Sequence, residues 1–388
     1  MEAIFWLSVA AVGYAYVGYP ILLSLLSLIR PKPVRSEAWT PSVTVIIAAY
    51  NEERDIAAKL ENTLALDYPE SQLEIIVTSD CSTDRTDEIV RSFSPRGVLL
   101  HRQDERHGKT AAQNAAVTKA RGEIIVFSDA TTHYQPDVLR LMTPAFADRS
   151  VGSVTGRVIY QDINQSSVGA GTQSYWNYEF FLKKHESNVC SLIGVCGCMY
   201  AVRKSAYVPL YNDACSDFII ATTMVEQGLR AVYVPEAVCM EEPNQQAKRE
   251  LAARVRIISQ TFSDLWRNRG MLNPFRSGFY AVQLWSHKIM RYLVPVFLIA
   301  IFITSGFLAP RHVFYAALFV AQVAFYLAAL ISWLLEKAGL SIRLLALPQY
   351  FVITNLASLI AFVKFISGET YTRWEPHREP VSVQSSKG

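Results

Sequence analysis

The chain has 388 residues, of which 51% are hydrophobic and 18% are charged. Soluble globular domains have roughly 25% charged residues, so the composition argues against an ordinary soluble globule, and the apolar content excludes a disordered chain. The net charge of +3, from 37 basic and 34 acidic residues, is too small to indicate nucleic-acid binding by electrostatics. We therefore expect a membrane-associated protein that does not bind nucleic acid.

An uncharged apolar segment extends from Ala3 to Ile29. It is long enough to span a bilayer and lacks the basic start and small-residue cleavage site of a signal peptide. Residues 1–30 are therefore predicted to form an uncleaved transmembrane anchor. Because Arg30, Lys32 and Arg35 follow the segment, the positive-inside rule places the N-terminus outside and the next domain in the cytoplasm.

Three more apolar segments lie at 292–308, 313–335 and 344–366, and nothing comparable lies between 42 and 270. The predicted organisation after the anchor is a polar domain at 41–270, an interfacial amphipathic segment at 271–291, a transmembrane bundle at 292–367 and a polar tail at 368–388. A first bundle helix whose basic side chains reach the interface fits 271–291 nearly as well. The basic residues of the tail leave its side of the membrane open, as well as whether one C-terminal segment is re-entrant.

Strands and helices alternate in the first part of the polar domain. Short β-branched runs predict strands at 42–48, 73–78, 97–101 and 123–127. Helices are expected at 51–66, 85–93, 109–120 and 217–227. This alternation predicts an α/β fold with a mostly parallel sheet and crossover helices.

Ligands of such sheets bind beyond the carboxyl ends of the strands. Polar residues follow the strands here, namely Asn51, Glu52, Asp80, Asp84, Lys109 and Asp129. The pattern indicates a nucleotide site. No G-x-G-x-x-G follows the first strand and no G-x-x-x-x-G-K-[ST] is present, so neither a dinucleotide-binding fold nor a P-loop is supported.

Six short motifs then follow one another in a recognisable order. They are Ile46-Ile-Ala-Ala-Tyr-Asn-Glu-Glu53, Ser79-Asp-Cys-Ser-Thr-Asp84, Gly108-Lys109 with Asn114, Ser128-Asp-Ala-Thr131, Cys215-Ser-Asp217 and Ala253-Arg-Val-Arg-Ile257. In this order they resemble the inverting family-two glycosyltransferases, over roughly 41–266. The likeness is greatest to the membrane-bound branch of cellulose, hyaluronan and poly-N-acetylglucosamine synthases.

That resemblance implies a GT-A-type domain at the cytoplasmic face of a bacterial inner membrane. It implies a UDP-sugar donor, a polysaccharide or lipid-linked acceptor, contact with membrane lipids and a Mg²⁺ or Mn²⁺ cofactor. Sequence alone leaves the sugar, the linkage, the acceptor and any partner subunits open.

The resemblance also assigns donor-site roles. Asn51, Glu52 and Asp80 would contact the nucleotide, with Asp80 accepting a hydrogen bond from uracil, and Lys109 would neutralise the diphosphate. The alternatives are a turn aspartate that caps the next helix, a job that Asp84 could also do, and a solvated lysine. Arg254 and Arg256 lie where the family has Q-x-x-R-W, where an arginine clamps the pyrophosphate; a merely interfacial Arg256 is the alternative.

For the metal, the resemblance assigns Asp129 to the first acid of the D-x-D motif, with Thr131 in place of the second. Asp217 corresponds to the general base that accepts the proton of the acceptor hydroxyl. The plain alternatives are a strand-end aspartate without a metal and an acidic residue in the first turn of a helix.

The acceptor side is less defined. Trp176, Tyr178 and Glu179 are candidates because sugars stack on aromatic rings, although the same residues could pack on the sheet or at the membrane interface.

Several family positions are changed: Ser79, Cys81, Thr131, Ser216, Ala253 and Ile257 replace the usual residues. Because Ile257 takes the place of a tryptophan on which a growing chain would stack, processive polymerisation is in doubt, and the sequence leaves processive or single transfer open. The changes also leave open a catalytically degenerate protein that binds a nucleotide sugar or a membrane partner.

Overall fold

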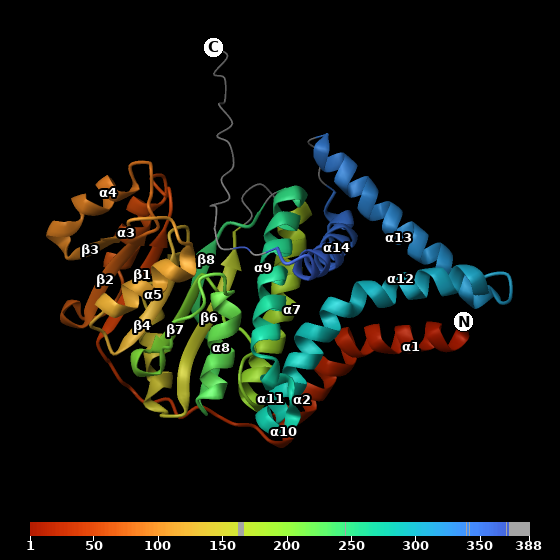
Figure 1. Ribbon diagram of the computed structural model, residues 1–388, viewed down its shortest axis with the longest axis horizontal. Coiled ribbons are helices and arrows are strands. Elements are labelled where there is room, and N and C mark those ends of the chain that lie inside the picture. The colour runs from red at the N-terminus through yellow and green to blue at the C-terminus, as the bar shows by residue number, and fades with distance from the viewer. Residues whose placement is uncertain (162–166, 245, 339, 341, 370, 372–388) are drawn as a thin grey trace, which may run out of the picture.

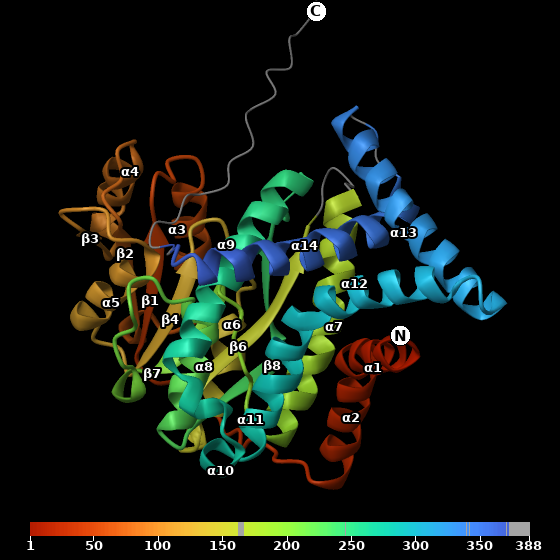
Figure 2. The ribbon, with the colours of Figure 1, turned by 45° about the vertical axis from the view of Figure 1, so that its right-hand side comes forward.

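The computed structural model describes residues 1–161, 167–244, 246–338, 340, 342–369 and 371. A polar domain built around one sheet occupies one side of the molecule, and long apolar helices project from the other (Figure 1). Figure 2 shows α9 and α14 crossing each other at the boundary between the two parts.

In the described part of the chain the sheet has eight strands, in the order β3-β2-β1-β4-β7-β6-β8-β5. The strands are β1 (Val43–Ala49), β2 (Leu73–Ser79), β3 (Val98–Arg102), β4 (Ile124–Asp129), β5 (His133–Tyr134), β6 (Val151–Tyr160), β7 (Met199–Arg203) and β8 (Arg230–Glu241). The first four pair in parallel, as do β6 and β8, whereas β7 is antiparallel to β4 and β6, and β5 is antiparallel to β8. The predicted α/β fold is confirmed, with a mixed sheet in which β1 to β4 form an all-parallel half.

Helices of the polar domain are α3 (Ile56–Leu64), α4 (Thr86–Ser92), α5 (Lys109–Lys119), α6 (Val138–Met142), α7 (Ser167–Val189), α8 (Ser216–Glu226) and α9 (Ala247–Arg267). Short helical turns are η2 (Glu70–Gln72), η3 (Ser94–Arg96), η4 (Thr143–Ala147), η5 (Lys204–Ala206) and η6 (Arg269–Leu272). The four helices expected from the sequence are present, but α3 begins at Ile56 and not at Asn51. Asn51 has a φ of 54°, a left-handed conformation that no α-helix continues.

The core of the polar domain is formed by the strands. All seven residues of β1 are buried, and the apolar residues of β2 and β4 join them in one cluster with α3, α5 and α6. Strands of a parallel sheet are covered on both faces, which is why β1 is apolar except for Thr44 and does not alternate.

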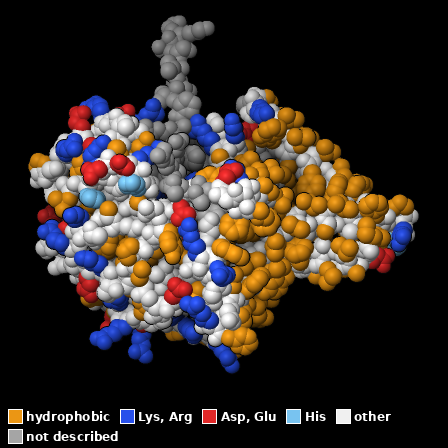
Figure 3. Space-filling view, in the orientation of Figure 1, with side chains coloured by type: hydrophobic (Ala, Val, Ile, Leu, Met, Phe, Trp, Pro, Cys, Tyr) orange, Lys and Arg blue, Asp and Glu red, His pale blue; other side chains and the backbone are white. Residues whose placement is uncertain are grey.

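Among the described residues, four helical stretches are long and apolar enough to cross a membrane: Glu2–Ile29, Phe279–Leu308, Val313–Lys337 and Ala346–Ile366. They consist of α1 (Glu2–Gly13), η1 (Tyr14–Gly18) and α2 (Tyr19–Ile29); α11 (Phe279–Gln283), η7 (Leu284–Ile289) and α12 (Met290–Leu308); α13 (Val313–Lys337); and α14 (Ala346–Ile366). Hydrophobic side chains cover the projecting part of the molecule, whereas charges are spread over the polar domain (Figure 3).

The segment expected at the interface, 271–291, contains α10 (Pro274–Ser277), α11 and η7, and it continues directly into α12. Both interpretations of this segment therefore remain predictions. The turn η8 (Arg343–Leu345) leads into α14, which packs along α9 and α7 and has 44% of its most apolar window buried. The predicted tail, 368–388, lies almost entirely outside the described residues.

Candidate active site

A cavity of about 1060 Å³ lies between the sheet, α7, α8, α9 and η7. It brings together nine of the residues that the sequence singles out: Glu52, Lys109, Asp129, Thr131, Trp176, Glu179, Asp217, Arg254 and Arg256. Asn51, Asp80 and Tyr178 are not among its lining residues. The polar residues at the carboxyl ends of the strands thus face α7, α8, α9 and η7 across one space.

Charged side chains in this cavity interact with one another. Asp129 ends β4, Lys109 begins α5, and their side chains form an ion pair. Burial lowers the pKa of the Lys109 ammonium, but the carboxylates of Asp129 and Asp217 outweigh burial and leave that pKa raised. Lys109 therefore stays positively charged and is available to an anionic group that enters the cavity.

Asp217 lies in the first turn of α8, where the helix dipole favours its negative charge. The thiol of Cys215 donates to Asp217 Oδ1 at 2.8 Å. A Cβ atom at Gly197 would lie 3.3–3.5 Å from atoms of the Asp217 side chain, so the glycine leaves space beside that carboxylate. The carboxylate is thus oriented by its own helix and exposed to the cavity.

Two acids that the sequence analysis missed belong to this region. Asp264 on α9 accepts the backbone N–H of Cys215 at 2.8 Å, and burial raises its pKa to about 7. Glu241, at the end of β8, lines the cavity; burial, followed by the charge of Asp129, raises its pKa to about 7. An acid among the apolar positions of an amphipathic helix was the available signal for Asp264, and an acid at a strand end was the signal for Glu241.

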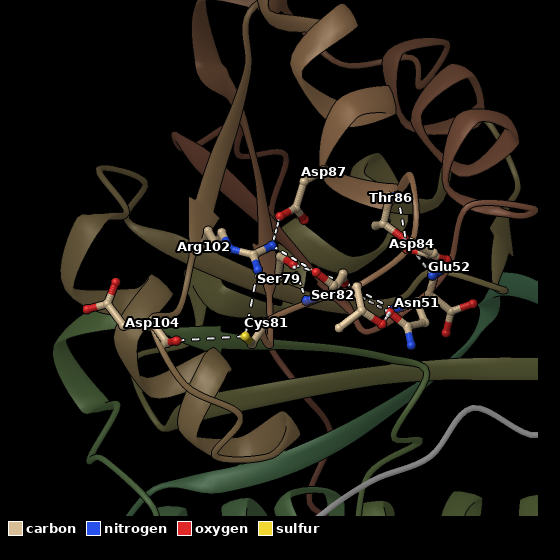
Figure 4. A network of polar contacts seen from close by, with 11 residues as sticks. Asn51, Glu52, Ser79, Cys81, Ser82, Asp84, Thr86, Asp87, Arg102 and Asp104 are labelled. Atoms are coloured by element: carbon tan, nitrogen blue, oxygen red, sulfur yellow. Dashed lines mark hydrogen bonds and ion pairs between the residues drawn. The ribbon is translucent and has the colours of Figure 1, made fainter.

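The loops after β1 and β2 are joined by side-chain hydrogen bonds (Figure 4). Asn51 Oδ1 accepts the backbone N–H of Thr83 at 2.7 Å, and the backbone N–H of Glu52 donates to Thr86 Oγ1 at 2.7 Å. Asp84 Oδ1 accepts the N–H of Thr86 at 3.0 Å. The Asn51 side chain is therefore committed to holding the second loop in place.

Cys81 takes the place of a glycine in the family motif and has a φ of 61°. It therefore keeps the left-handed backbone that glycine would adopt without strain, and its thiol contacts Arg102 and the carbonyl of Asp104 (Figure 4). The substitution preserves the course of the loop.

Asp80 is 1% exposed and accepts two backbone hydrogen bonds, from His107 to Oδ1 and from Gly108 to Oδ2, both 2.9 Å long. Gly108 precedes α5 with a φ of 95°. Asp80 thus secures the start of the helix that begins with Lys109, while the cap of the next helix after Asp80, α4, comes from Asp84. The contact of Asp80 with the uracil of the nucleotide remains a prediction.

The two arginines of α9 differ in their surroundings. Arg254 forms an ion pair with Glu250 at 2.8 Å, contacts the hydroxyl of Tyr350 on α14 and lies 4.2 Å from the centre of the Tyr175 ring. Burial raises the pKa of Glu250, but Arg254 and the hydrogen bonds bring it below its usual value. Arg256 lines the cavity without an ion pair to any carboxylate of the described residues. Arg254 therefore links α9 to α14, whereas Arg256 is free to meet an anion.

The three predicted acceptor residues have different surroundings in the structure. Trp176 lines the cavity but packs on the main core, with its ring 5.5 Å from that of Phe180. The hydroxyl of Tyr178 donates to the carbonyl of Tyr16 in the first apolar helix, at 3.2 Å. All three assignments stay predictions.

Glu179 is held in a cluster of charges. It forms ion pairs with Arg291 and with His287, the latter at 3.1 Å, and His287 also contacts Glu186 at 2.7 Å. Burial raises the pKa of Glu179, but Arg291 and His287 lower it well below its usual range. Glu179 is thus a permanent carboxylate that joins α7 to η7 and to the first turn of α12.

The donor set for a divalent cation is made of oxygen atoms. Asp129 contributes a carboxylate and Thr131 a hydroxyl to the cavity, with the carboxyl of Glu241 in the same space. Within the described ranges no group of three or more His, Cys, Asp or Glu side chains is arranged to hold a metal by itself. Hard oxygen donors of this kind fit Mg²⁺ or Mn²⁺ if phosphate oxygens complete the coordination.

Two curated relatives of this chain are sugar-polymer or glycolipid synthases. A 26% identical relative over 236 residues is the poly-beta-1,6-N-acetyl-D-glucosamine synthase of Staphylococcus aureus; the match covers 58% of this chain and 52% of that protein. The beta-monoglucosyldiacylglycerol synthase of Nostoc sp. is 33% identical over 134 residues, covering 33% of this chain and 29% of that one. The chain thus spans about half the length, or less, of these relatives.

Among solved structures, the mannosyltransferase PcManGT from Pyrobaculum calidifontis, in complex with GDP-Man and Mn²⁺, superimposes with a TM-score of 0.73. The superposition covers 94% of this chain and 99% of that one at 22% identity, so it shows a shared fold. Residues 44–208 match the model of glycosyl transferase family 2. Residues 44–208 are thus similar to a glycosyltransferase family 2 domain, and the chain shares its fold with this mannosyltransferase.

Proposed function

We propose that the protein is an inverting glycosyltransferase of a bacterial inner membrane, with its polar domain in the cytoplasm. It moves a sugar from a UDP-sugar to a polysaccharide or glycolipid acceptor. The observation that carries this proposal is the meeting of Lys109, Asp129 and Asp217 in one cavity at the carboxyl edge of the sheet.

Each of these residues has a role in the transfer. Lys109 and Arg256 bind the diphosphate, because both present positive charge to the cavity. Asp217 accepts the proton of the acceptor hydroxyl as its oxygen attacks the anomeric carbon from the side opposite the diphosphate. Cys215 and the dipole of α8 keep the Asp217 carboxylate oriented for that attack.

Asp129 and Thr131 would hold the divalent cation, which supplies charge neutralisation for the departing nucleoside diphosphate. Lys109, whose ammonium is paired with Asp129, would then form an ion pair with the phosphates. Binding of GDP-Man and Mn²⁺ by the Pyrobaculum mannosyltransferase is consistent with ligands of this kind.

The test is release of nucleoside diphosphate from a panel of UDP- and GDP-sugars by the purified protein in lipid. We expect one UDP-sugar to be turned over and the release to require a divalent cation. Turnover of a GDP-sugar alone would correct the donor and leave the mechanism intact. Tight nucleotide binding without release from any donor would instead favour the catalytically degenerate protein.

A further inference from the structure

An apolar groove of about 280 Å³ lies between α9, α12 and α14. Its walls are mainly aromatic and aliphatic side chains, among them Phe262, Trp266, Leu293, Val296, Phe362 and Phe365. Trp266 is 62% exposed and Phe362 is 45% exposed, so the groove opens at the molecular surface. Since α12 and α14 belong to segments long enough to cross a membrane, this opening is suited to a lipid chain.

The groove and the active-site cavity lie on two sides of the same helices. On α9, Thr261 lines the cavity and the next residue, Phe262, lines the groove. On η7, Lys288 lines the cavity and the next residue, Ile289, lines the groove. The groove and the cavity thus adjoin across α9 and η7, with Lys288 one residue away from the groove lining.

Lys288 brings a positive charge to this boundary. Its ammonium lies 5.4 Å from the centre of the Phe218 ring, and no carboxylate of the described residues forms an ion pair with it. The neighbouring Arg291, by contrast, is paired with Glu179. Lys288 thus presents its positive charge to the cavity with no ion pair to hold it, so it is suited to an anionic ligand.

A second cation lies on the same wall. The ammonium of Lys183 on α7 lines the cavity and donates to the carbonyl of Gly194, which leaves its charge without a carboxylate among the described residues. The proposed donor diphosphate has Lys109 and Arg256 as its cations. Lys183 and Lys288 thus remain for a second anion on the membrane side.

We infer that the acceptor is a membrane lipid with a phosphate-bearing headgroup and a free headgroup hydroxyl, an inference that rests on the proposed transferase function. Its chain occupies the groove, its phosphate pairs with Lys288, and its hydroxyl reaches Asp217. The hydroxyl oxygen bonds to the anomeric carbon, while the bond from that carbon to the diphosphate oxygen breaks. The proton passes to Asp217, and the nucleoside diphosphate leaves with the bonding electrons.

The experiment uses full-length protein in vesicles of phosphatidylcholine with or without phosphatidylglycerol. Two activities are measured: transfer of labelled sugar into the lipid extract, and hydrolysis of the donor by water, which needs no acceptor. We expect lipid-extractable product only with phosphatidylglycerol. Donor hydrolysis without lipid product in either vesicle overturns this inference and leaves the proposed function standing, whereas absence of both activities contradicts the proposed function itself.

Variants locate the site. Lys288→Gln should raise the apparent KM for phosphatidylglycerol at least about tenfold, the effect of losing one charge-assisted hydrogen bond, with donor affinity within a few-fold of wild type. Lys288→Arg should restore most of the lipid affinity. If Lys288→Gln weakens donor and lipid binding equally, the lysine binds the donor diphosphate and the inference fails.

Leu293→Trp fills the groove and should also raise the KM for the lipid, independently of whether Lys288→Gln folds. Ile303→Trp, on the same helix and outside the groove, is the matched control and should leave it unchanged. If soluble glycerol phosphate or inorganic phosphate competed with the lipid as well as added vesicles do, the site would bind the headgroup alone and the chain would have no site. If Leu293→Trp and Ile303→Trp changed the KM for the lipid equally, the chain would not bind in the groove.

Discussion

Asp264 on α9 accepts the backbone N–H of Cys215, the residue that precedes α8, at 2.8 Å. The helix that presents Asp217 is therefore fixed to the helix that presents Arg256. Asp264 is fully buried, and its Oδ1 atom has no hydrogen-bond partner among the described residues. Burial is the main reason why its pKa is raised to about 7.

The raised pKa gives a signed prediction for stability. The ordinary value is 3.8, so folding takes up a proton between about pH 4 and pH 7, and the contribution of Asp264 to stability falls as the pH rises through this window. Asp264→Asn can still accept the N–H of Cys215 but cannot ionise. We expect the free energy of unfolding of the variant, relative to wild type, to increase as the pH rises, by up to about 1.4 kcal/mol per pH unit. Unfolding measurements at pH 4–8 check this.

Asp213 is the matched control for Asp264. It pairs with Arg267 through two hydrogen bonds of 2.7 Å, and that contact lowers its pKa. Its stabilisation is present above the ordinary pKa and is lost as the pH falls. Asp213→Asn should therefore lose stability relative to wild type at neutral pH and approach it in acid, which is the opposite trend. If the stability differences of the two variants from wild type changed with pH in the same direction, Asp264 would not titrate as described.

The arginines of α9 should respond differently to the same substitution. Arg254→Gln leaves Glu250 buried without its cation, so we expect a loss of about 3–5 kcal/mol in stability. Arg256→Gln should leave the unfolding temperature nearly unchanged and weaken UDP binding at least about tenfold, because a charge-assisted contact to phosphate is lost. Unfolding and nucleotide titration of both variants check this, and a reversed pattern would reassign the clamp to Arg254.

Thr131 replaces an acid of the family motif, so the cation has one anionic ligand fewer. Thr131→Asp should lower the Mn²⁺ or Mg²⁺ concentration that gives half-maximal turnover, because a hard cation prefers carboxylate oxygens. Thr131→Ser is the control that keeps a hydroxyl. Activity of the wild-type protein that survives thorough chelation would show that Asp129 and Thr131 hold no cation.

The sequence was sufficient where a role depends on local pattern. The β-branched run at 42–48 predicts β1, and polar residues after successive strands predict the shared edge that holds Asp129. It was insufficient where partners are distant in the chain. The contact of Arg254 with Tyr350, 96 residues away, depends on how α14 packs on α9. The apolar periodicity of either helix alone does not predict this packing. The antiparallel position of β7 between β4 and β6 is likewise set by the assembled sheet.

Tyr178 illustrates the same limit at the acceptor side. An aromatic residue near a predicted sugar site is equally suited to stacking on sugar or to packing on protein. Its hydroxyl reaches the carbonyl of Tyr16 in a helix more than 150 residues earlier. Only the placement of that helix distinguishes the two roles.

The mechanism depends most on Asp217, and its carboxamide variant is the decisive test. Asp217→Asn keeps the volume of the side chain and its contact with Cys215 but cannot accept a proton at neutral pH. General-base assistance contributes about 10²–10⁴-fold, or roughly 3–5 kcal/mol of barrier, so turnover should fall by this factor while UDP affinity stays within a few-fold of wild type.

Asp80→Asn is the comparison for Asp217→Asn. Both carboxylate oxygens of Asp80 accept backbone N–H groups, and an amide nitrogen in place of one oxygen would face a donor with a donor. The start of α5 and the position of Lys109 should be disturbed, so nucleotide binding weakens first and turnover at saturating donor falls less. UDP titration and steady-state rates of both variants separate the two effects. If Asp217→Asn keeps near-normal turnover, or loses UDP binding and activity in parallel, another group must accept the proton.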